Sequence, residues 1–303
     1  MCPITVLPIS DPDRNLIEGT GGYGAGLTRY LTERGELIIE LDRPDRPARR
    51  NGAKSDSIDA VRAGREALTR EHLGQPRGAG ERAALSVRVA ARRSAVEAST
   101  VAQCQLQSLI VAAPEAIRTR FRGLSTTTTI TLATRLRTAR SWDLETRSYA
   151  DALRQLARRI RTLHTEATAH EQALTAIIKT WRPDLLDQPG VGPIVAATVL
   201  CAWSHPGRCR NDAAFANLAG VAPIPASSGL TTRHRLNRRG DRQLNRALHV
   251  VALSRLRHDP ATRAYADRRR AQGKTDREIR RCLKRYIARQ LYRQLEHGPP
   301  IAP

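Results

Sequence analysis

Two adjacent serines, Ser227 and Ser228, precede Gly229 and a dense cluster of basic side chains. A serine hydroxyl is a nucleophile once a neighbouring group activates it, and arginine binds phosphate through paired hydrogen bonds. A hydroxyl beside a basic cluster therefore indicates chemistry on a nucleic-acid backbone. The alternative is a turn in which the serine hydrogen-bonds the backbone, and it stays open because no GxSxG nucleophile elbow surrounds the pair. The cluster consists of Arg233, His234, Arg235, Arg238, Arg239 and Arg242.

Three carboxylates near the N-terminus are candidate metal ligands. Glu18 ends an expected strand, and Asp56 and Asp59 lie three residues apart at the start of an expected helix, so both face the same way. Divalent cations prefer carboxylate oxygens, and two-metal phosphoryl chemistry requires such a cluster. The alternative is that Asp56 caps the helix while Asp59 occupies its favourable first turn.

A second candidate for phosphate binding is the segment QPGVGP, in which Gly190 and Gly192 flank Val191 before an apolar helix. This pattern is typical of a helix-hairpin-helix, in which backbone N–H groups at a helix N-terminus bind phosphate without reading sequence. The alternative is a tight turn between two helices.

The overall charge supports a nucleic-acid partner. The 303 residues carry a formal net charge of +22, and such a charge opposes compaction unless a polyanion shares the surface. An aromatic content of 4% argues against base-stacking platforms. A genome of high GC content is an alternative reason for the preference for arginine over lysine, but it does not explain the net charge.

Cysteine usage and hydropathy bear on the compartment. Five scattered cysteines have no zinc spacing and are expected to be small core residues in a reducing cytosol. No apolar run approaches the roughly 20 residues of a membrane span, and no signal peptide is recognisable. We expect no membrane partner and a bacterial cytoplasmic, nucleoid-associated protein.

The elements that would position these residues form three expected regions. In residues 1–108, a strand ending at Glu18, a helix near 25–34 and a strand at 37–41 form a β–α–β pattern that favours a parallel sheet. Residues 80–112 are expected to be helical, with apolar positions at Leu85, Val89, Val96, Val101, Leu106 and Ile110.

The second region, 109–180, contains an expected loop at Thr126–Thr129 and a long amphipathic helix over about 143–180. This pattern predicts a helical hairpin or coiled-coil arm, or alternatively an ordinary helix in a bundle. The third region, 181–303, has an expected helix at about 241–257 capped by Asp241, and a final helix that Thr275 and Glu278 open with a capping box. The final helix carries an apolar stripe formed by Ile279, Leu283, Ile287, Leu291 and Leu295.

Five motifs, in this order, resemble the DEDD transposases of the insertion sequence 110 family. They are EGTGGYGAGLTRYL, KSDSIDA, PGVGPIVAATVL, GVAPIPASSGLTTRHRLNRRGDRQLNRAL and HDPATRAYADRRRAQGKTDREIRRCLKRYIARQLY, and they span Leu16 to Tyr292. The resemblance implies an α/β RNase H-like (RuvC-type) domain, an oligomerising helical arm and a mostly helical C-terminal transposase domain.

The same resemblance implies roles for individual residues. Ser228 matches the nucleophile that forms a covalent link to DNA, with Ser227 as second choice, and Glu18, Asp56 and Asp59 match acidic ligands of Mg²⁺. A structured guide RNA and a homo-oligomer, a dimer or tetramer, are the implied partners besides element-end and target DNA.

One departure concerns the family's first aspartate, which lies on an opening strand some tens of residues before the glutamate. Only 17 residues precede Glu18 here, and Asp11 and Asp13 flank Pro12 in an expected loop. We therefore expect a truncated, inactive copy or a true start upstream. Two alternatives to a recombinase are a catalytically inactive nucleic-acid-binding protein and a metal-dependent nuclease whose serine is structural.

Overall fold

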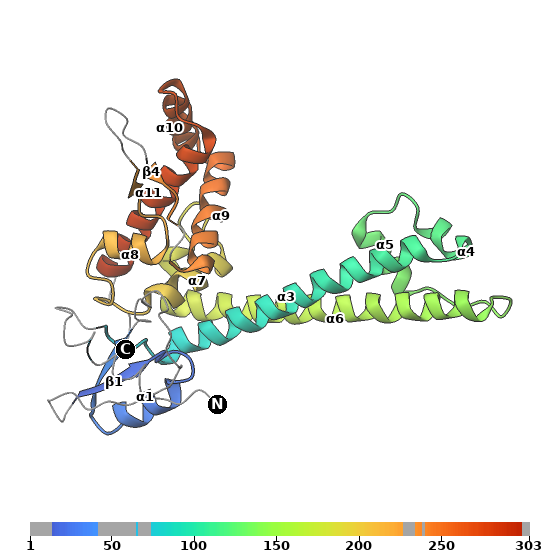
Figure 1. Cartoon of the computed structure of the whole chain (residues 1–303), viewed down its shortest axis with the longest axis horizontal. Helices are drawn as coiled ribbons and strands as arrows, with labels where there is room; N and C mark the ends of the chain where they lie inside the picture. Colours follow the sequence, from blue (N-terminus) through green and yellow to red (C-terminus); the bar gives the residue numbers. More distant parts are fainter. Residues whose placement is uncertain (1–13, 42–64, 66–73, 227–233, 238–239, 299–303) are drawn as a thin grey trace, which may run out of the picture. The chain divides into compact units, whose positions relative to one another are not determined.

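The structure, a computed structural model, describes residues 14–41, 65, 74–226, 234–237 and 240–298. Most of these residues are helical, and the strands are few and short. The chain divides into two compact units (Figure 1). The first contains the chain up to Ala84 together with Val199–Pro300, and the second contains Leu85–Thr198.

The first unit begins with the predicted β–α–β pattern. Strand β1 (Arg14–Glu18) and strand β2 (Leu37–Leu41) pair in parallel, with Arg14 opposite Leu37 and Glu18 opposite Leu41. Helix α1 (Ala25–Thr32) connects them, and Gly35 turns the chain at φ +77° before β2. Within the described residues, this pattern confirms a parallel pair. The RNase H-like identity of the domain stays a prediction.

The C-terminal helices form the larger part of the first unit. Helix α11 (Asp276–His297) packs against α8 (Asp212–Leu218), α9 (Arg242–His258) and α10 (Pro260–Ala271). The predicted capping box is present, because Thr275 and Glu278 exchange hydrogen bonds at the start of α11. The predicted apolar stripe is confirmed, since all five of its members are buried: Ile279, Leu283, Ile287, Leu291 and Leu295.

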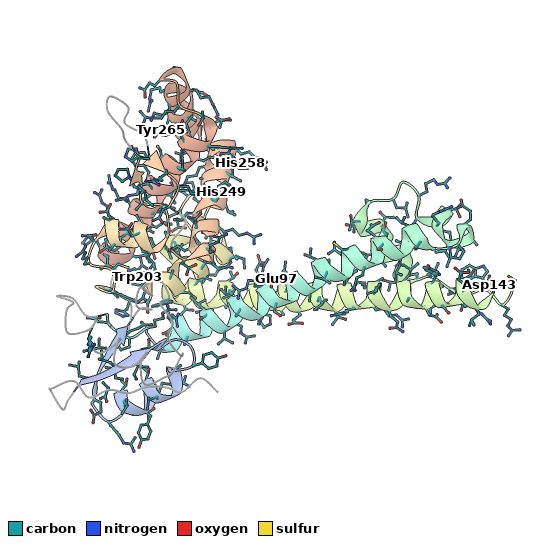
Figure 2. All side chains as sticks on the ribbon, in the orientation of Figure 1. Glu97, Asp143, Trp203, His249, His258 and Tyr265 are labelled. Carbon is teal, nitrogen blue, oxygen red and sulfur yellow. The ribbon has the colours of Figure 1, made fainter. Side chains whose placement is uncertain are left out.

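Buried aromatic residues join α11 to the segment that follows α7 (Pro193–Trp203). The indole of Trp203, labelled in Figure 2, is fully buried and donates from Nε1 to Oε1 of Glu296 at 2.6 Å. Tyr292 donates from its hydroxyl to the carbonyl of Cys209 at 2.6 Å. The buried polar groups of Trp203 and Tyr292 therefore both have a hydrogen-bond partner, which stabilises them in the core.

The second unit is built on two long helices, α3 (Gly80–Ala112) and α6 (Leu144–Trp181) (Figure 1). Both were predicted, and Asp143 caps α6 by accepting from the backbone N–H of Thr146. Side chains join the two helices, as Arg92 donates to Glu171 at 3.1 Å. The buried positions of α6 alternate at spacings of four and three through much of the helix, which is the pattern of one packed face; they are Thr146, Ala150, Leu153, Ala157, Ile160, Ala167, Leu174 and Ile178.

One expectation about this unit is wrong, and two others, on the apolar positions of α3 and on the cysteines, hold only in part. Thr126–Thr129 is the start of helix α5 (Thr126–Thr134), because Ser125 caps it by accepting from Thr128 N–H and its apolar residues pack against α6.

On α3, three of the predicted apolar positions are buried, Leu85, Leu106 and Ile110, whereas Val96 and Val101 are exposed. The small residues Ala95, Ser99 and Ala102 are buried in the middle of the helix, so apolar periodicity alone did not locate that part of the inward face. Among the described cysteines, Cys209 alone is buried, and Cys104 is exposed.

The short elements of the second unit are α4 (Glu115–Arg118), η1 (Thr119–Phe121) and η2 (Pro183–Leu185). Ile117 and Phe121 join a core cluster with residues of α3, α5 and α6. No helix in the described part of the chain combines the length and apolar character needed to cross a bilayer.

Candidate nucleic-acid interface

A pocket of about 650 Å³ in the C-terminal part of the first unit lies beside a short strand pair. Strands β3 (Ile224–Pro225) and β4 (His234–Arg235) are antiparallel, with Pro225 opposite His234. The pocket wall comes from α8 and the chain after it, from β4, and from α10 and α11. Its basic members are His234, Arg235, Arg269, Lys274, Arg281, Lys284, Arg285 and Arg289.

The pocket is strongly electropositive. Among its described lining residues, Glu278 is the single carboxylate, and it already accepts the backbone N–H of Thr275 in the capping box. Clustered cations in a hollow raise the local concentration of anions. The surface is therefore suited to a phosphate-bearing ligand.

Two guanidinium N–H groups of the pocket have no hydrogen-bond acceptor among the described residues. They are Nη1 of Arg285 and Nε of Arg269, and both atoms are buried. A buried donor without an acceptor costs free energy, so native proteins rarely leave one unpaired. A phosphate oxygen would satisfy such donors with strong, charge-assisted hydrogen bonds.

Lys284 is the most buried cation of the pocket, with 8% of its surface exposed. Its Nζ donates to Oδ1 of Asn245 at 2.9 Å, and Nδ2 of Asn245 donates to the carbonyls of Ala219 and Gly220 at 2.8 and 3.1 Å. Burial lowers the pKa of Lys284, and the neighbouring Arg281 lowers it further. This network ties the α11 wall of the pocket to the chain that leads into β3.

A second tie, which we call the clasp, joins residues 217–220 to Gly240 and Asp241. The N–H of Asp241 donates to the carbonyl of Leu218 at 2.6 Å, and Gly240 has φ +98°. A Cβ at Gly240 would lie 2.6 Å from Gly220 N and from Leu218 O, so only glycine fits. Asp241 also caps α9, as predicted, by accepting from Gln243 and Leu244 N–H.

Asp212 orients two arginines of the pocket. Its Oδ2 accepts from Arg285 Nη2 at 2.9 Å and from Arg289 Nε at 2.8 Å. The hydrogen bonds from Arg289 and Arg285 lower the pKa of Asp212. The carboxylate therefore stays ionised at neutral pH and holds both guanidinium groups in place.

The predicted basic cluster is described only in part. His234 and Arg235 are exposed on β4 and line the pocket, and Arg242 is exposed at the first position of α9. Arg233, Arg238 and Arg239 lie outside the described residues, as do both candidate nucleophiles, Ser227 and Ser228.

The glycine turn predicted to bind phosphate lies in the second unit, between η2 and α7. Gly190 has φ +78°, and Val191 N–H donates to Gln188 O at 3.0 Å. Gly192 is exposed directly before the first residue of α7. The turn is therefore formed, and its role in phosphate binding stays a prediction.

The predicted metal ligands are not brought together by the described residues. Glu18 is the last residue of β1, whereas Asp56 and Asp59, like the side chain of Glu18, lie outside the description. Over the described ranges no group of three or more His, Cys, Asp or Glu side chains is placed to hold a metal ion. The magnesium site stays a prediction.

Sequence reasoning missed the acidic residue Glu40 of β2. Its side chain is 5% exposed and lies between Arg77, at 3.4 Å, and Arg208, at 3.7 Å. These ion pairs join the strand pair to the segment after α7. The signal was a single glutamate inside the apolar run LIIEL of residues 37–41.

Sequence reasoning also missed the basic face of α11. Arg281, Arg285 and Arg289 recur every four residues, and this spacing places them on one side of a helix. The pattern was available in the sequence, but nothing local indicated that this side would face β4.

Comparison with known proteins finds a family match that covers part of the pocket lining. Residues 183–267 match the family model of the transposase IS116/IS110/IS902 family. A protein of 43.6 kDa from insertion element IS110 of Streptomyces coelicolor is 34% identical over 146 residues, 47% of this chain and 36% of that protein. A 42 kDa protein from insertion element IS900 of Mycobacterium paratuberculosis is 33% identical over 129 residues, 41% of this chain and 32% of that protein. The matches thus span about a third of the length of each relative.

Proposed function

We propose that the chain, whose residues 183–267 match the transposase IS116/IS110/IS902 family, is a member of that family and cuts and rejoins DNA for an insertion element. The observation that carries the proposal is the basic pocket with its two unpaired buried guanidinium donors, on Arg285 and Arg269. Part of the pocket lies inside the matched segment, and the strands β3 and β4 flank the stretch of sequence that contains Ser227 and Ser228.

We assign Ser228 as the nucleophile. Its hydroxyl oxygen would attack a backbone phosphorus, and the bond from phosphorus to the leaving ribose oxygen would break. The serine proton passes to a base, and the leaving oxygen takes up a proton. The product is a serine–DNA phosphodiester, which a free strand hydroxyl then attacks, so that a new DNA phosphodiester forms and the serine is released. Cations of the pocket would stabilise the charge on the five-coordinate phosphorus.

A magnesium ion fits the predicted acidic set by its chemistry. Glu18, Asp56 and Asp59 offer hard oxygen donors, and Glu18 ends a strand of a parallel pair, where α/β folds place their ligands. A bound Mg²⁺ would neutralise charge on the scissile phosphate. These three residues would hold the ion, and the pocket cations would orient the DNA.

The partners proposed for this activity are element-end and target DNA, a structured guide RNA and further copies of the chain. The net charge of +22 supports a polyanionic partner. Guide RNA and homo-oligomer follow from the family resemblance. Binding should weaken steeply from about 50 to 200 mM salt, because phosphate contacts release counterions.

The test is strand exchange with the full chain, cognate RNA, donor DNA and target DNA. Ser228→Ala should abolish exchange and the covalent protein–DNA adduct, whereas the matched neighbour variant Ser227→Ala should keep both. Asp59→Asn should abolish exchange while DNA binding persists. Exchange retained in Ser228→Ala would overturn the serine assignment.

The same experiment separates the alternatives. Cleavage without any adduct in the unsubstituted chain would identify a metal-dependent nuclease with a structural serine. Salt-dependent binding without cleavage would identify a nucleic-acid-binding protein without catalysis.

A further inference from the structure

The second unit carries a basic cleft of its own. It has a volume of about 480 Å³ and is lined by residues of the turn after α5, Thr134–Thr138, and by Arg154 and Arg158 of α6. Four of its seven lining residues are arginines: Arg135, Arg137, Arg154 and Arg158. None of the lining residues is acidic. We propose that this cleft binds a nucleic-acid backbone as a second contact, separate from the pocket of the first unit.

The cleft is held in a defined shape. Arg154 donates from Nε to the carbonyl of Leu136 at 2.8 Å and from Nη1 to Oδ1 of Asp151 at 2.8 Å. Leu136 is buried in the core cluster of the unit. The backbone of the turn after α5 is therefore fixed to α6. This restrains the positions from which Arg135 and Arg137 line the cleft.

The remaining arginines are available to a ligand. Across the residues that the structure describes, no carboxylate pairs with Arg135, Arg137 or Arg158, and all three are exposed. Between residues 115 and 161 the sequence contains eleven arginines and four carboxylates. Three of the four carboxylates are engaged, Glu115 with Arg118 and Arg122, Asp151 with Arg154, and Asp143 as the cap of α6.

One feature opposes an anion here, because α5 ends in the cleft and a helix C-terminus carries partial negative charge. Its last carbonyls are already occupied, since Arg135 N–H donates to Leu132 O and Leu136 N–H donates to Ala133 O. The three arginines without a carboxylate partner among the described residues, Arg135, Arg137 and Arg158, outweigh about half a negative charge on the helix end. The cleft therefore favours a polyanion.

The ligand chemistry is a run of phosphodiesters. Guanidinium groups match phosphate with paired hydrogen bonds, and a chain of phosphates can engage several of them together. Arg158 lies 23 residues before the end of α6 at Trp181, which is about 35 Å along the helix axis. A contact so far along the helix suits an extended duplex or a folded RNA, and a second contact on one ligand raises overall affinity.

The test compares two triple variants of the full chain. Arg135→Ala, Arg137→Ala and Arg158→Ala together remove the free cleft cations and leave Arg154, which fixes the turn. The control removes the same charge from exposed positions of α6 outside the cleft, with Arg159→Ala, Arg161→Ala and Lys179→Ala. Circular dichroism and thermal unfolding check that both variants fold.

Binding is measured by fluorescence anisotropy against salt, with a DNA duplex in one arm and an RNA hairpin in the other. The cleft variant should reduce the slope of log affinity against log salt by about 2.7 for duplex DNA, from about 0.9 per lost phosphate contact. The control variant should keep the slope. If the slope falls for only one of the two nucleic acids, that nucleic acid is the ligand of the cleft.

Equal slopes for the two variants in both arms would overturn the proposal. Photo-crosslinking followed by mass spectrometry gives an independent readout. The absence of nucleic-acid adducts on peptides that cover 134–158 would also overturn the cleft proposal. Neither readout depends on strand exchange, so the cleft proposal and the serine assignment fail separately.

Discussion

Nζ of Lys284 on α11 and Oδ1 of Asn245 on α9 are 2.9 Å apart, and the same asparagine amide bonds the carbonyls of Ala219 and Gly220. One side chain thus supports both a buried cation and the chain that enters β3. Removing the Asn245 side chain leaves the buried charge of Lys284 unpaired, whereas replacing Lys284 removes that charge. The two substitutions should therefore lower the stability by different amounts.

We predict that Asn245→Ala destabilises the first unit more than Lys284→Met does. The alanine leaves a buried ammonium and two carbonyls unpaired, at a cost of about 3 kcal/mol, whereas methionine leaves one amide oxygen unpaired, at about 1 kcal/mol. Urea unfolding reports this through Trp203 in a chain with Trp142→Phe and Trp181→Phe. The reverse order of stability would contradict a charged Lys284 held by Asn245.

Asp212→Asn should change stability and binding in opposite directions. Loss of the two ion pairs with Arg285 and Arg289 should lower the free energy of unfolding by about 1–2 kcal/mol. The two freed guanidinium groups should tighten DNA binding and steepen its salt dependence. The control Asp267→Asn removes the same charge and one of the two ion pairs of Arg270, outside the pocket, while Asp276 still pairs with Arg270. Similar gains in binding for both variants would show that net charge, rather than the pocket, is responsible.

The stability of the first unit should fall as pH drops below 6.5, in part through His249 on α9 (Figure 2). Burial lowers the pKa of His249, and Lys284 and Arg280 lower it further. Below its ordinary pKa of 6.5 the unfolded chain therefore binds a proton that the folded chain resists, so acid favours unfolding. Above 6.5 both states are neutral and the effect vanishes.

The measurement is the thermal midpoint from pH 7.5 to 5 for the unsubstituted chain and His249→Gln. The variant should lose less stability across this window. His258→Gln, at an exposed position of the same helix, should follow the unsubstituted chain. Identical pH profiles for His249→Gln and the unsubstituted chain would show that His249 does not contribute.

Gly240→Ala should destabilise the first unit by more than about 3 kcal/mol, since it combines an unfavourable φ with overlap against fixed backbone atoms. Gly273→Ala is the matched control, because Gly273 also has a positive φ, +78°, but no heavy atom within 4 Å of an added Cβ. It should cost about 1 kcal/mol. Equal losses of unfolding free energy for the two variants, measured through Trp203, would mean that the backbone around Gly240 moves to accommodate an added Cβ.

Local signals account for much of what was predictable from the sequence. The β–α–β pattern, the long helices and the caps at Asp241 and Thr275 follow from hydrogen bonds and periodicity within a few residues. The stripe on α11 was equally clear, because its apolar residues recur at spacings of four.

The pocket could not be predicted in the same way. Its wall joins residues 213–237 to residues 269–289, and their proximity depends on how α8, α9 and α11 pack. Lys284 lies beside the apolar stripe, and its burial depends on Asn245, 39 residues earlier in the chain. The threonine run after Ser125 likewise became helical through burial against α6, which overrides weak helix propensity.

The clasp has a topological consequence. Asp241 N donates to Leu218 O at 2.6 Å. This hydrogen bond holds together the two ends of the segment 221–239. Helices α8 and α9, on either side of this segment, both pack on α11. A chain divided between residues 226 and 234 should therefore still assemble from its two fragments, with α8 and α9 packed on α11.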